Sequence, residues 1–362
     1  MSVDEKVGVV SMPADVRNGV KVGPPPAFDP ECSPALVAAQ AVFPEPVTSE
    51  LLPVIRQMVA YGDPTDADLE RGGAYRVQEK SAPGLEGAPA VPLLVCTPTA
   101  AKAPTPAVYY VHGGGMISGG RRSDMGWVLD YAEAEGLAVV GVEYRLAPEH
   151  PDPAPIDDCY AGLLWIIDHA EELNIDPDRI LIFGMSAGGG LAAGVALRCR
   201  DQKGPKLIGQ MLTCPMLDER NDTASSFQFQ GNGSWIRESN EFGWNALLGD
   251  RRRKADVSPY TSPSRAADLS DLPPTFLDVG SAEVFRDEAV DYASRIWAAG
   301  GNAELHVWPG GYHGFDRFAP AAAVSQDATR ARARWLHRLL SQQPSQLEKT
   351  GHVPWSGVNL GF

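Results

Sequence analysis

A serine between small residues is the side chain of this 362-residue sequence best suited to covalent chemistry. The segment GMSAG at 184–188 has the spacing G-x-S-x-G, and it lies between an apolar run at 179–184 and a helical pattern at 191–202. In that setting the motif forms a sharp turn that presents the serine hydroxyl at the edge of a sheet. We therefore predict that Ser186 is a nucleophile, and the chemistry that it indicates is acyl transfer.

A serine hydroxyl is a weak nucleophile and needs a general base, which follows the serine in this arrangement. Four histidines follow Ser186. His306 falls in a predicted strand, His337 on a predicted helix and His352 in the C-terminal tail. His313 lies in the segment PGGYHGFD, a glycine-rich loop after the predicted strand. We therefore predict that His313 is the base.

The acid that orients the base should lie after a strand and before His313. The segment LDVGSAEVFRDEAVDYA offers Asp278 within the predicted strand, Glu283 on the following loop, and Asp287 and Glu288 at the start of the next helix. Acids in the first turn of a helix are favoured by its dipole whatever the function. Glu283 is the first choice. Asp287 stays open as the alternative, because it could reach back from the first helical turn if the loop is tight.

The segment HGGG at 112–115 directly follows a predicted buried strand at 107–112. Acyl transfer needs preorganised N–H groups for a developing oxyanion. Gly113 and Gly114 can present such groups where a side chain would obstruct the substrate, and Ala187 would supply a third. The segment lacks both the G-K-[ST] ending of a phosphate-binding loop and the G-x-G-x-x-G spacing of a dinucleotide site. An oxyanion hole is thus the favoured interpretation.

Strand and helix patterns alternate from about residue 73. The predicted strands are 75–80, 91–98, 107–112, 137–144, 179–184, 207–215, 274–280 and 303–309, and the predicted helices are 125–136, 155–173, 191–202, 286–300 and 323–342. This alternation indicates right-handed crossovers and a mostly parallel sheet. The last strand could lie at an open edge and pair across a two-fold axis, so a homodimer is expected.

Two segments depart from the alternation. Residues 1–45 are rich in proline and form an N-terminal arm, which a plausible helix at 48–62 follows. Residues 218–265 are too long for a connection, which favours a lid or binding element. This insertion carries the aromatic residues Phe227, Phe229, Trp235, Phe242 and Trp244. They are expected either to wall a pocket for short acyl chains and a bulky partner group, or only to anchor the insertion.

Composition excludes several classes of protein. The net charge of −15 argues against nucleic-acid binding, and the basic run at 251–254 is expected to be a solvated helix end or loop. Five scattered cysteines without a C-x-x-C pair argue against a zinc site and disulfides. The sequence has no signal-peptide pattern and no apolar stretch long enough to span a bilayer. We therefore expect a cytoplasmic protein without a metal.

The segments HGGG, YRLAPEHP, GMSAGGG, EVFRDEAVDYA and GGYHGF follow one another between about residues 90 and 340. In these segments the chain resembles the hormone-sensitive-lipase family of α/β-hydrolases, also called bacterial family IV esterases. The resemblance implies an α/β-hydrolase fold, with a mostly parallel eight-stranded sheet flanked by helices and a helical cap. It also implies Ser186 as nucleophile, His313 as base, Gly113, Gly114 and Ala187 as oxyanion donors, and no metal or organic cofactor.

The expected division is an N-terminal arm contributing to the cap at 1–45, a core at 46–217, a cap insertion at 218–265, a second core part at 266–345 and a tail at 346–362. The expected activity is hydrolysis of small-molecule esters with short to medium acyl groups, through an acyl-enzyme. Two positions depart from the family pattern, since Met185 precedes the serine and Glu283 stands where aspartate is usual. A receptor on the same scaffold is disfavoured because His313 is present, whereas a lyase or dehydratase is excluded only weakly.

Overall fold

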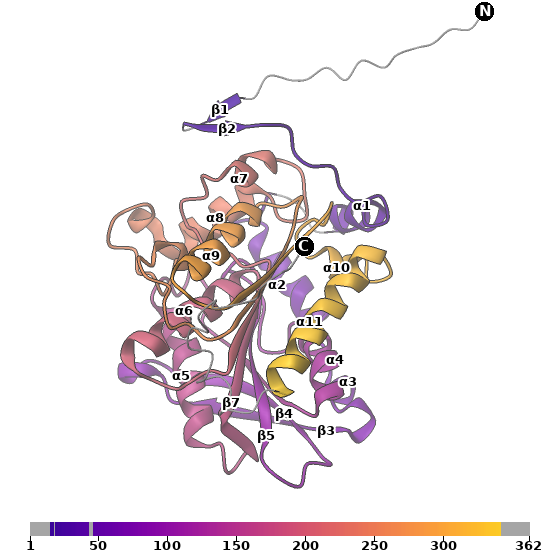
Figure 1. Ribbon diagram of the computed structural model, residues 1–362, viewed down its shortest axis with the longest axis vertical. Coiled ribbons are helices and arrows are strands. Elements are labelled where there is room, and N and C mark those ends of the chain that lie inside the picture. The colour runs from indigo at the N-terminus through magenta and orange to yellow at the C-terminus, as the bar shows by residue number, and fades with distance from the viewer. Residues whose placement is uncertain (1–14, 18, 43–45, 342–362) are drawn as a thin grey trace, which may run out of the picture.

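Eight strands form one sheet at the centre of the computed structural model, which describes residues 15–17, 19–42 and 46–341 (Figure 1). The strand order is β10-β9-β8-β7-β5-β6-β4-β3. The strands are β3 Tyr75–Ala82, β4 Val91–Pro98, β5 Thr105–Val111, β6 Ala138–Val142, β7 Ile175–Met185, β8 Gly209–Thr213, β9 Thr275–Gly280 and β10 Ala303–Trp308. Strand β4 runs antiparallel to β3 and β6, and the other pairs are parallel. The prediction of a mostly parallel eight-stranded sheet is confirmed.

Helices cover both faces of this sheet. They are α1 Ser33–Val42, α2 Leu52–Tyr61, α3 Asp66–Leu69, α4 Met125–Glu135, α5 Ala154–Asp168, α6 Ala187–Gln202, α7 Ala224–Gln228, α8 Arg237–Leu248, α9 Arg286–Ala298, α10 Phe315–Phe318 and α11 Ala323–Ser341. Alternate residues of a strand point to opposite faces. Tyr109 of β5 accordingly packs in the core with α5, α6 and α9, and its neighbour Tyr110 packs in the core with α4 and α11. No helix among the described residues is both long and apolar enough to cross a membrane.

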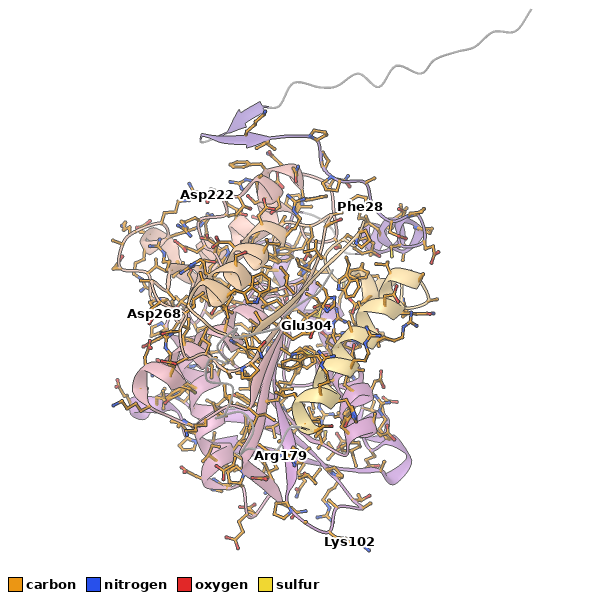
Figure 2. The ribbon with its side chains drawn as sticks, viewed as in Figure 1. Phe28, Lys102, Arg179, Asp222, Asp268 and Glu304 are labelled. Carbon is orange, nitrogen blue, oxygen red and sulfur yellow. The ribbon has the colours of Figure 1, made fainter. Side chains whose placement is uncertain are left out.

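Strands β5 and β7 run toward one end of the molecule. Figure 2 shows Lys102, just before β5, and Arg179, early in β7, at the end opposite to Phe28 and Asp222. Phe28 precedes α1, and Asp222 belongs to the insertion. The carboxyl ends of these strands therefore point to the end of the molecule where the N-terminal segment and the insertion lie. A short hairpin of β1 Asp15–Arg17 and β2 Val20–Val22 also lies there (Figure 1).

Several element boundaries differ from the sequence-based prediction, and two of them belong to β7 and α6, the elements on either side of Ser186. Strand β7 begins at Ile175 rather than at residue 179, because Ile175 pairs with Thr105 before a register irregularity. Helix α6 begins directly at Ala187, so the glycine run 188–190 is helical. Glycine usually weakens a helix. Here a Cβ at Gly190 would lie 2.0 Å from the carbonyl oxygen of Met216, so close packing requires these residues.

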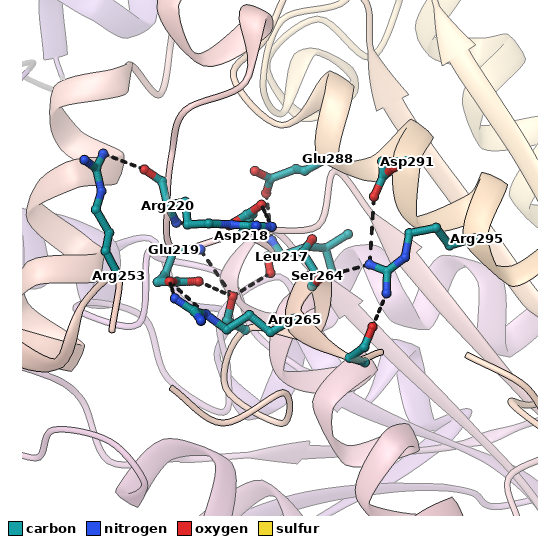
Figure 3. A network of polar contacts seen from close by, with 12 residues as sticks. Leu217, Asp218, Glu219, Arg220, Arg253, Ser264, Arg265, Glu288, Asp291 and Arg295 are labelled. Atoms are coloured by element: carbon teal, nitrogen blue, oxygen red, sulfur yellow. Dashed lines mark hydrogen bonds and ion pairs between the residues drawn. The ribbon is translucent and has the colours of Figure 1, made fainter. Parts of the chain in front are cut away.

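The two ends of the insertion are tied together by a buried polar network (Figure 3). Glu219, whose side chain is fully buried, accepts hydrogen bonds from Arg265 Nε at 2.9 Å and Ser262 Oγ at 2.6 Å. The amide of Ser264 donates to the carbonyl of Leu217 at 3.1 Å. We call the contacts of Glu219 with Ser262 and Arg265 the clasp. The clasp joins the start of the insertion to its end, so α7 and α8 are held on the body at both sides.

The basic run at 251–254 lies in the turn and loop after α8, where Arg253 and Lys254 are exposed as expected, whereas the Arg252 side chain is only 7% exposed. Arg251 forms an ion pair with Asp152 at 2.6 Å, and Arg252 forms one with Glu241 at 2.7 Å. Arg253 donates to the carbonyl of Arg220 (Figure 3). These contacts fasten the segment that follows α8.

We predict that Arg265→Met lowers the free energy of unfolding by about 3–5 kcal/mol, because it leaves the buried Glu219 carboxylate without its ion-pair partner. Burial raises the pKa of Glu219, but hydrogen bonds from Arg265 and Ser262 outweigh it and hold that pKa below its ordinary value. The stabilisation is thus present above the unfolded pKa and is lost as the pH falls through the folded one. Denaturant unfolding at neutral and acidic pH measures both effects.

The matched control is Arg330→Met, which removes an exposed ion pair with Asp327 and should change stability by less than about 1 kcal/mol. Equal losses in the two variants would show that the clasp contributes no more than a surface pair.

Candidate active site

Ser186 sits on a strained turn between β7 and α6, with φ 58° and ψ −122°. Glycines allow this turn, since a Cβ at Gly184 would lie 2.0 Å from the carbonyl oxygen of Gly188. A Cβ at Gly188 would lie equally close, 2.0 Å, to the carbonyl oxygen of Val111. The Ser186 amide donates to the carbonyl of Thr213 at 2.9 Å, which fastens the turn to β8. The hydroxyl is thus held in place by backbone that only this motif permits.

Ser186, His313 and Glu283 form one hydrogen-bonded chain. The Ser186 hydroxyl donates to His313 Nε2 at 3.0 Å, and His313 Nδ1 donates to Glu283 Oε2 at 2.7 Å. Glu283 is 1% exposed, Ser186 5% and His313 9%. The structure therefore brings together the three residues that the sequence singled out, in the order nucleophile, base and acid.

Glu283 occupies the position beside the base, and Asp287 does not. The second carboxylate oxygen of Glu283 accepts from the amide of Gly280 at 3.2 Å. Burial raises the pKa of Glu283, while the attraction of His313 and its hydrogen bond oppose that rise. Asp287 instead accepts from the amide of Ser225 at 2.7 Å and pairs with Arg286 at 2.7 Å. Asp287 therefore attaches α9 to α7 of the insertion.

The glycine segment after β5 lies against the nucleophile. A Cβ at Gly113 would be 3.4 Å from Ser186 Cβ, so a side chain there would crowd the hydroxyl. In the described part of the chain, the amides of Gly113 and Gly114 have no hydrogen-bond acceptor. Ala187 opens α6, and the first amides of a helix lack intrahelical acceptors. Among the described residues, these three N–H groups therefore have no backbone acceptor.

Two aromatic side chains that the sequence analysis did not single out support the glycine segment. His112 Nδ1 donates to the carbonyl of Gly113 at 2.7 Å, and its ring stacks on Tyr144 at 4.1 Å. The Tyr144 hydroxyl donates to the carbonyl of His112 at 3.0 Å. Burial lowers the pKa of His112 against the opposing effect of the hydrogen bond to Gly113, which favours the neutral imidazole. Both residues lie in the quoted segments HGGG and YRLAPEHP, but only the fold pairs them.

A cavity of about 370 Å³ opens onto the Ser186 hydroxyl. Its apolar walls include Ile55, Met58 and Val59 from α2, together with Trp235 and Phe318. The volume lies within the usual range for small-molecule pockets. Helix α2, the insertion and α10 therefore enclose one chamber, and Ser186 and His313 lie in its wall.

Of the five aromatic residues of the insertion named above, only Trp235 lines this cavity. Trp244 is fully buried in the core, Phe229 packs on Phe28 at 6.0 Å, and the Phe227 ring lies under Arg237 at 4.0 Å. Phe242 packs against the core as well. Trp235 therefore fits the expected pocket wall, and the other four aromatic side chains anchor the insertion.

Among the described residues, one group of three side chains has its ligand atoms close enough for a metal ion: Cys214, Glu283 and His313. Cysteine binds metals as the thiolate. Burial, and then Glu283, raise the pKa of Cys214 well above its ordinary value. The group therefore presents a neutral thiol, and its histidine and carboxylate already bond to one another, so the chemistry of these donors does not favour a metal.

Residues 108–317 match the family described as alpha/beta hydrolase fold, and this match covers more than half of the sequence. The chain belongs to the hormone-sensitive-lipase-like family of α/β-hydrolases. The resemblance in the sequence motifs is thereby confirmed, and with it the α/β-hydrolase fold.

Curated relatives of this α/β-hydrolase include the carboxylesterase NlhH of Mycobacterium tuberculosis, 35% identical over 70% of this chain and 80% of that protein. The esterase LipI of the same organism is 33% identical over 63% of this chain and 71% of its own. Among solved structures, a bacterial heroin esterase is similar with a TM-score of 0.79 and 38% identity, over 87% of this chain and 99% of that one. The esterase LipW from Mycobacterium marinum has a TM-score of 0.76 and 32% identity, over 88% and 99%.

Proposed function

We propose that this α/β-hydrolase hydrolyses carboxylic esters of small molecules through an acyl-enzyme. The observation that carries the proposal is the continuous hydrogen-bonded chain from Ser186 through His313 to Glu283 at the wall of the cavity. Relatives named as carboxylesterases and esterases support it.

In the proposed mechanism, His313 takes the proton of Ser186 as the serine oxygen attacks the ester carbonyl. The carbonyl oxygen becomes an oxyanion and accepts hydrogen bonds from the amides of Gly113, Gly114 and Ala187. His313 then gives its proton to the departing alcohol, which leaves an acyl group on the serine. Water, deprotonated by His313, attacks that acyl group and releases the acid. Glu283 stays ionised and stabilises the imidazolium in both halves.

We also propose that the N-terminal arm, 1–45, and the insertion, 218–265, form the cap, with the core at 46–217 and 266–345; residues 1–14, 18, 43–45 and 342–362, which include the expected tail at 346–362, lie outside the described residues. The amide side chain of Gln40 donates to the carbonyl of Gly233 at 2.9 Å, which joins α1 to the insertion. Ser234 donates to the carbonyl of His313, which joins the insertion to the loop of the base. The limited cavity volume supports short to medium acyl groups as substrates.

The test is a series of p-nitrophenyl esters of increasing acyl length. We expect the highest kcat/KM at short to medium chains, because longer chains exceed the cavity. Ser186→Ala should abolish turnover and leave the melting temperature close to that of the wild type. Near-wild-type turnover in this variant would remove Ser186 from the mechanism, and a preference for chains beyond about ten carbons would contradict the short-acyl proposal.

Two variants, each of which replaces a carboxylate by a carboxamide of nearly the same size, test which residue is the acid. Glu283→Gln should lower kcat by roughly 10³- to 10⁴-fold, because it removes the charge that stabilises the imidazolium. Asp287→Asn is the matched control and should lower the melting temperature with little change in kcat. The opposite pattern would transfer the role of acid to Asp287.

We further propose a cytoplasmic homodimer. Unpaired backbone on an edge strand is a template for pairing with a second chain. Strand β10 stands at one edge of the described sheet, and Val307 on it is 39% exposed. Sedimentation at micromolar concentration should therefore give about twice the chain mass of 38.8 kDa. A mass of one chain would reject the dimer.

A further inference from the structure

The charged residues that line the cavity are all acidic. Asp63 and Asp124 line it together with His313, and none of the described lining residues is a lysine or an arginine. The two aspartates line the same cavity as Ser186. A substrate that binds there to react with Ser186 therefore lies close to both carboxyl groups. Their side chains are therefore candidates for selecting substrates by charge.

The two aspartates differ in their partners. Asp124 forms an ion pair with Arg317 at 2.5 Å. Asp63 accepts a hydrogen bond from the Ser123 hydroxyl at 2.9 Å and has no ion pair within the described ranges. The nearby Arg122 pairs with Asp66 at 2.7 Å and with Glu79 at 2.9 Å. Asp63 is thus a pocket carboxylate without an ion-pair partner among the described residues, and Arg122 acts on it only from a distance.

The surroundings of Asp63 also favour a cation. Asp63 follows Gly62, the C-cap of α2, and the carboxyl end of a helix carries partial negative charge. Burial, and then repulsion from Asp124 and Glu143, raise the pKa of Asp63, while the Ser123 hydrogen bond and the more distant Arg122 only partly oppose that rise. A bound positive group would relieve this repulsion. The net charge of −15 adds a long-range attraction for cations.

We propose that Asp63 selects esters that carry an ammonium or similar cationic group, which it binds as a counter-ion while Ser186 attacks the ester. The proposal rests on the proposed hydrolase function and names the substrate class of the same site. The apolar walls from α2 and the Trp235 ring would surround the carbon substituents of the cation. Aromatic faces themselves attract quaternary ammonium groups.

The test compares two acetate esters of equal shape, acetylcholine and its neutral isostere 3,3-dimethylbutyl acetate. In wild-type protein we expect kcat/KM to favour the cationic ester by roughly five- to tenfold, about 1 kcal/mol or slightly more. This preference should shrink as salt is added. Asp63→Asn keeps an acceptor for Ser123 and should bring the ratio close to one.

Glu70→Gln is the matched control, because it removes one negative charge from an exposed side chain outside the cavity. It should keep the wild-type ratio. The proposal is overturned if the ratio of the two kcat/KM values is the same in the wild type and in Asp63→Asn. It is also overturned if Glu70→Gln lowers this ratio as much as Asp63→Asn does.

A binding measurement separates this proposal from the hydrolase function. Calorimetry with tetraethylammonium on wild-type protein and on Asp63→Asn needs no turnover. If tetraethylammonium binds at least fivefold more weakly to the variant than to the wild type, the cation site is supported, even if neither ester is hydrolysed. The absence of hydrolysis would then count against the esterase function alone. Equal binding, or none to the wild type, overturns the cation site even where Ser186-dependent ester hydrolysis is found.

Discussion

Arg332 of α11 joins the two loops that carry Glu283 and His313. Its guanidinium donates to Asp278 of β9, which precedes the Glu283 loop, with Nε at 2.8 Å and Nη2 at 2.7 Å. It also donates to Asp316 of α10, just after His313. All three charged side chains are at most 3% exposed. Because removing one partner from such a buried group leaves an unpaired charge, the two loops are strongly constrained to one relative position.

This arrangement also sets the charge around His313. Glu283, Asp278 and Asp316 place three carboxylates in the same buried region, and Arg332 pairs with two of them. Burial raises the pKa of Asp278, whereas Arg332 lowers it. The remaining negative charge lies beside the imidazole. An imidazolium formed there is stabilised without any movement of the surrounding groups, which is the kind of preorganisation that catalysis needs.

Much of this architecture could be predicted because its signals are local. The turn at Ser186 needs small residues at fixed spacing, and the strands are apolar runs in regular alternation with helices, so both are visible in a single sequence. The partners of individual side chains are not. The sequence leaves Asp287 open as an acid, because nothing in its own segment reveals that it meets Ser225 of α7. Asp63 reaches the cavity only because α2 packs beside the glycine segment, a contact with no local pattern.

The glutamate in place of the usual aspartate has a physical explanation in the same region. A glutamate side chain loses more conformational freedom than an aspartate side chain when it is fixed in one rotamer. It therefore needs a second contact to hold its carboxylate in place beside the imidazole. Glu283 uses one oxygen for His313 and turns the other back to the amide of Gly280, at the end of β9. This contact with the backbone fixes the longer side chain in one conformation and attaches its carboxylate to the end of β9. Because Asp278 on the same strand is held by Arg332, the orientation of the base is coupled through Glu283 to the buried ion pair of α11.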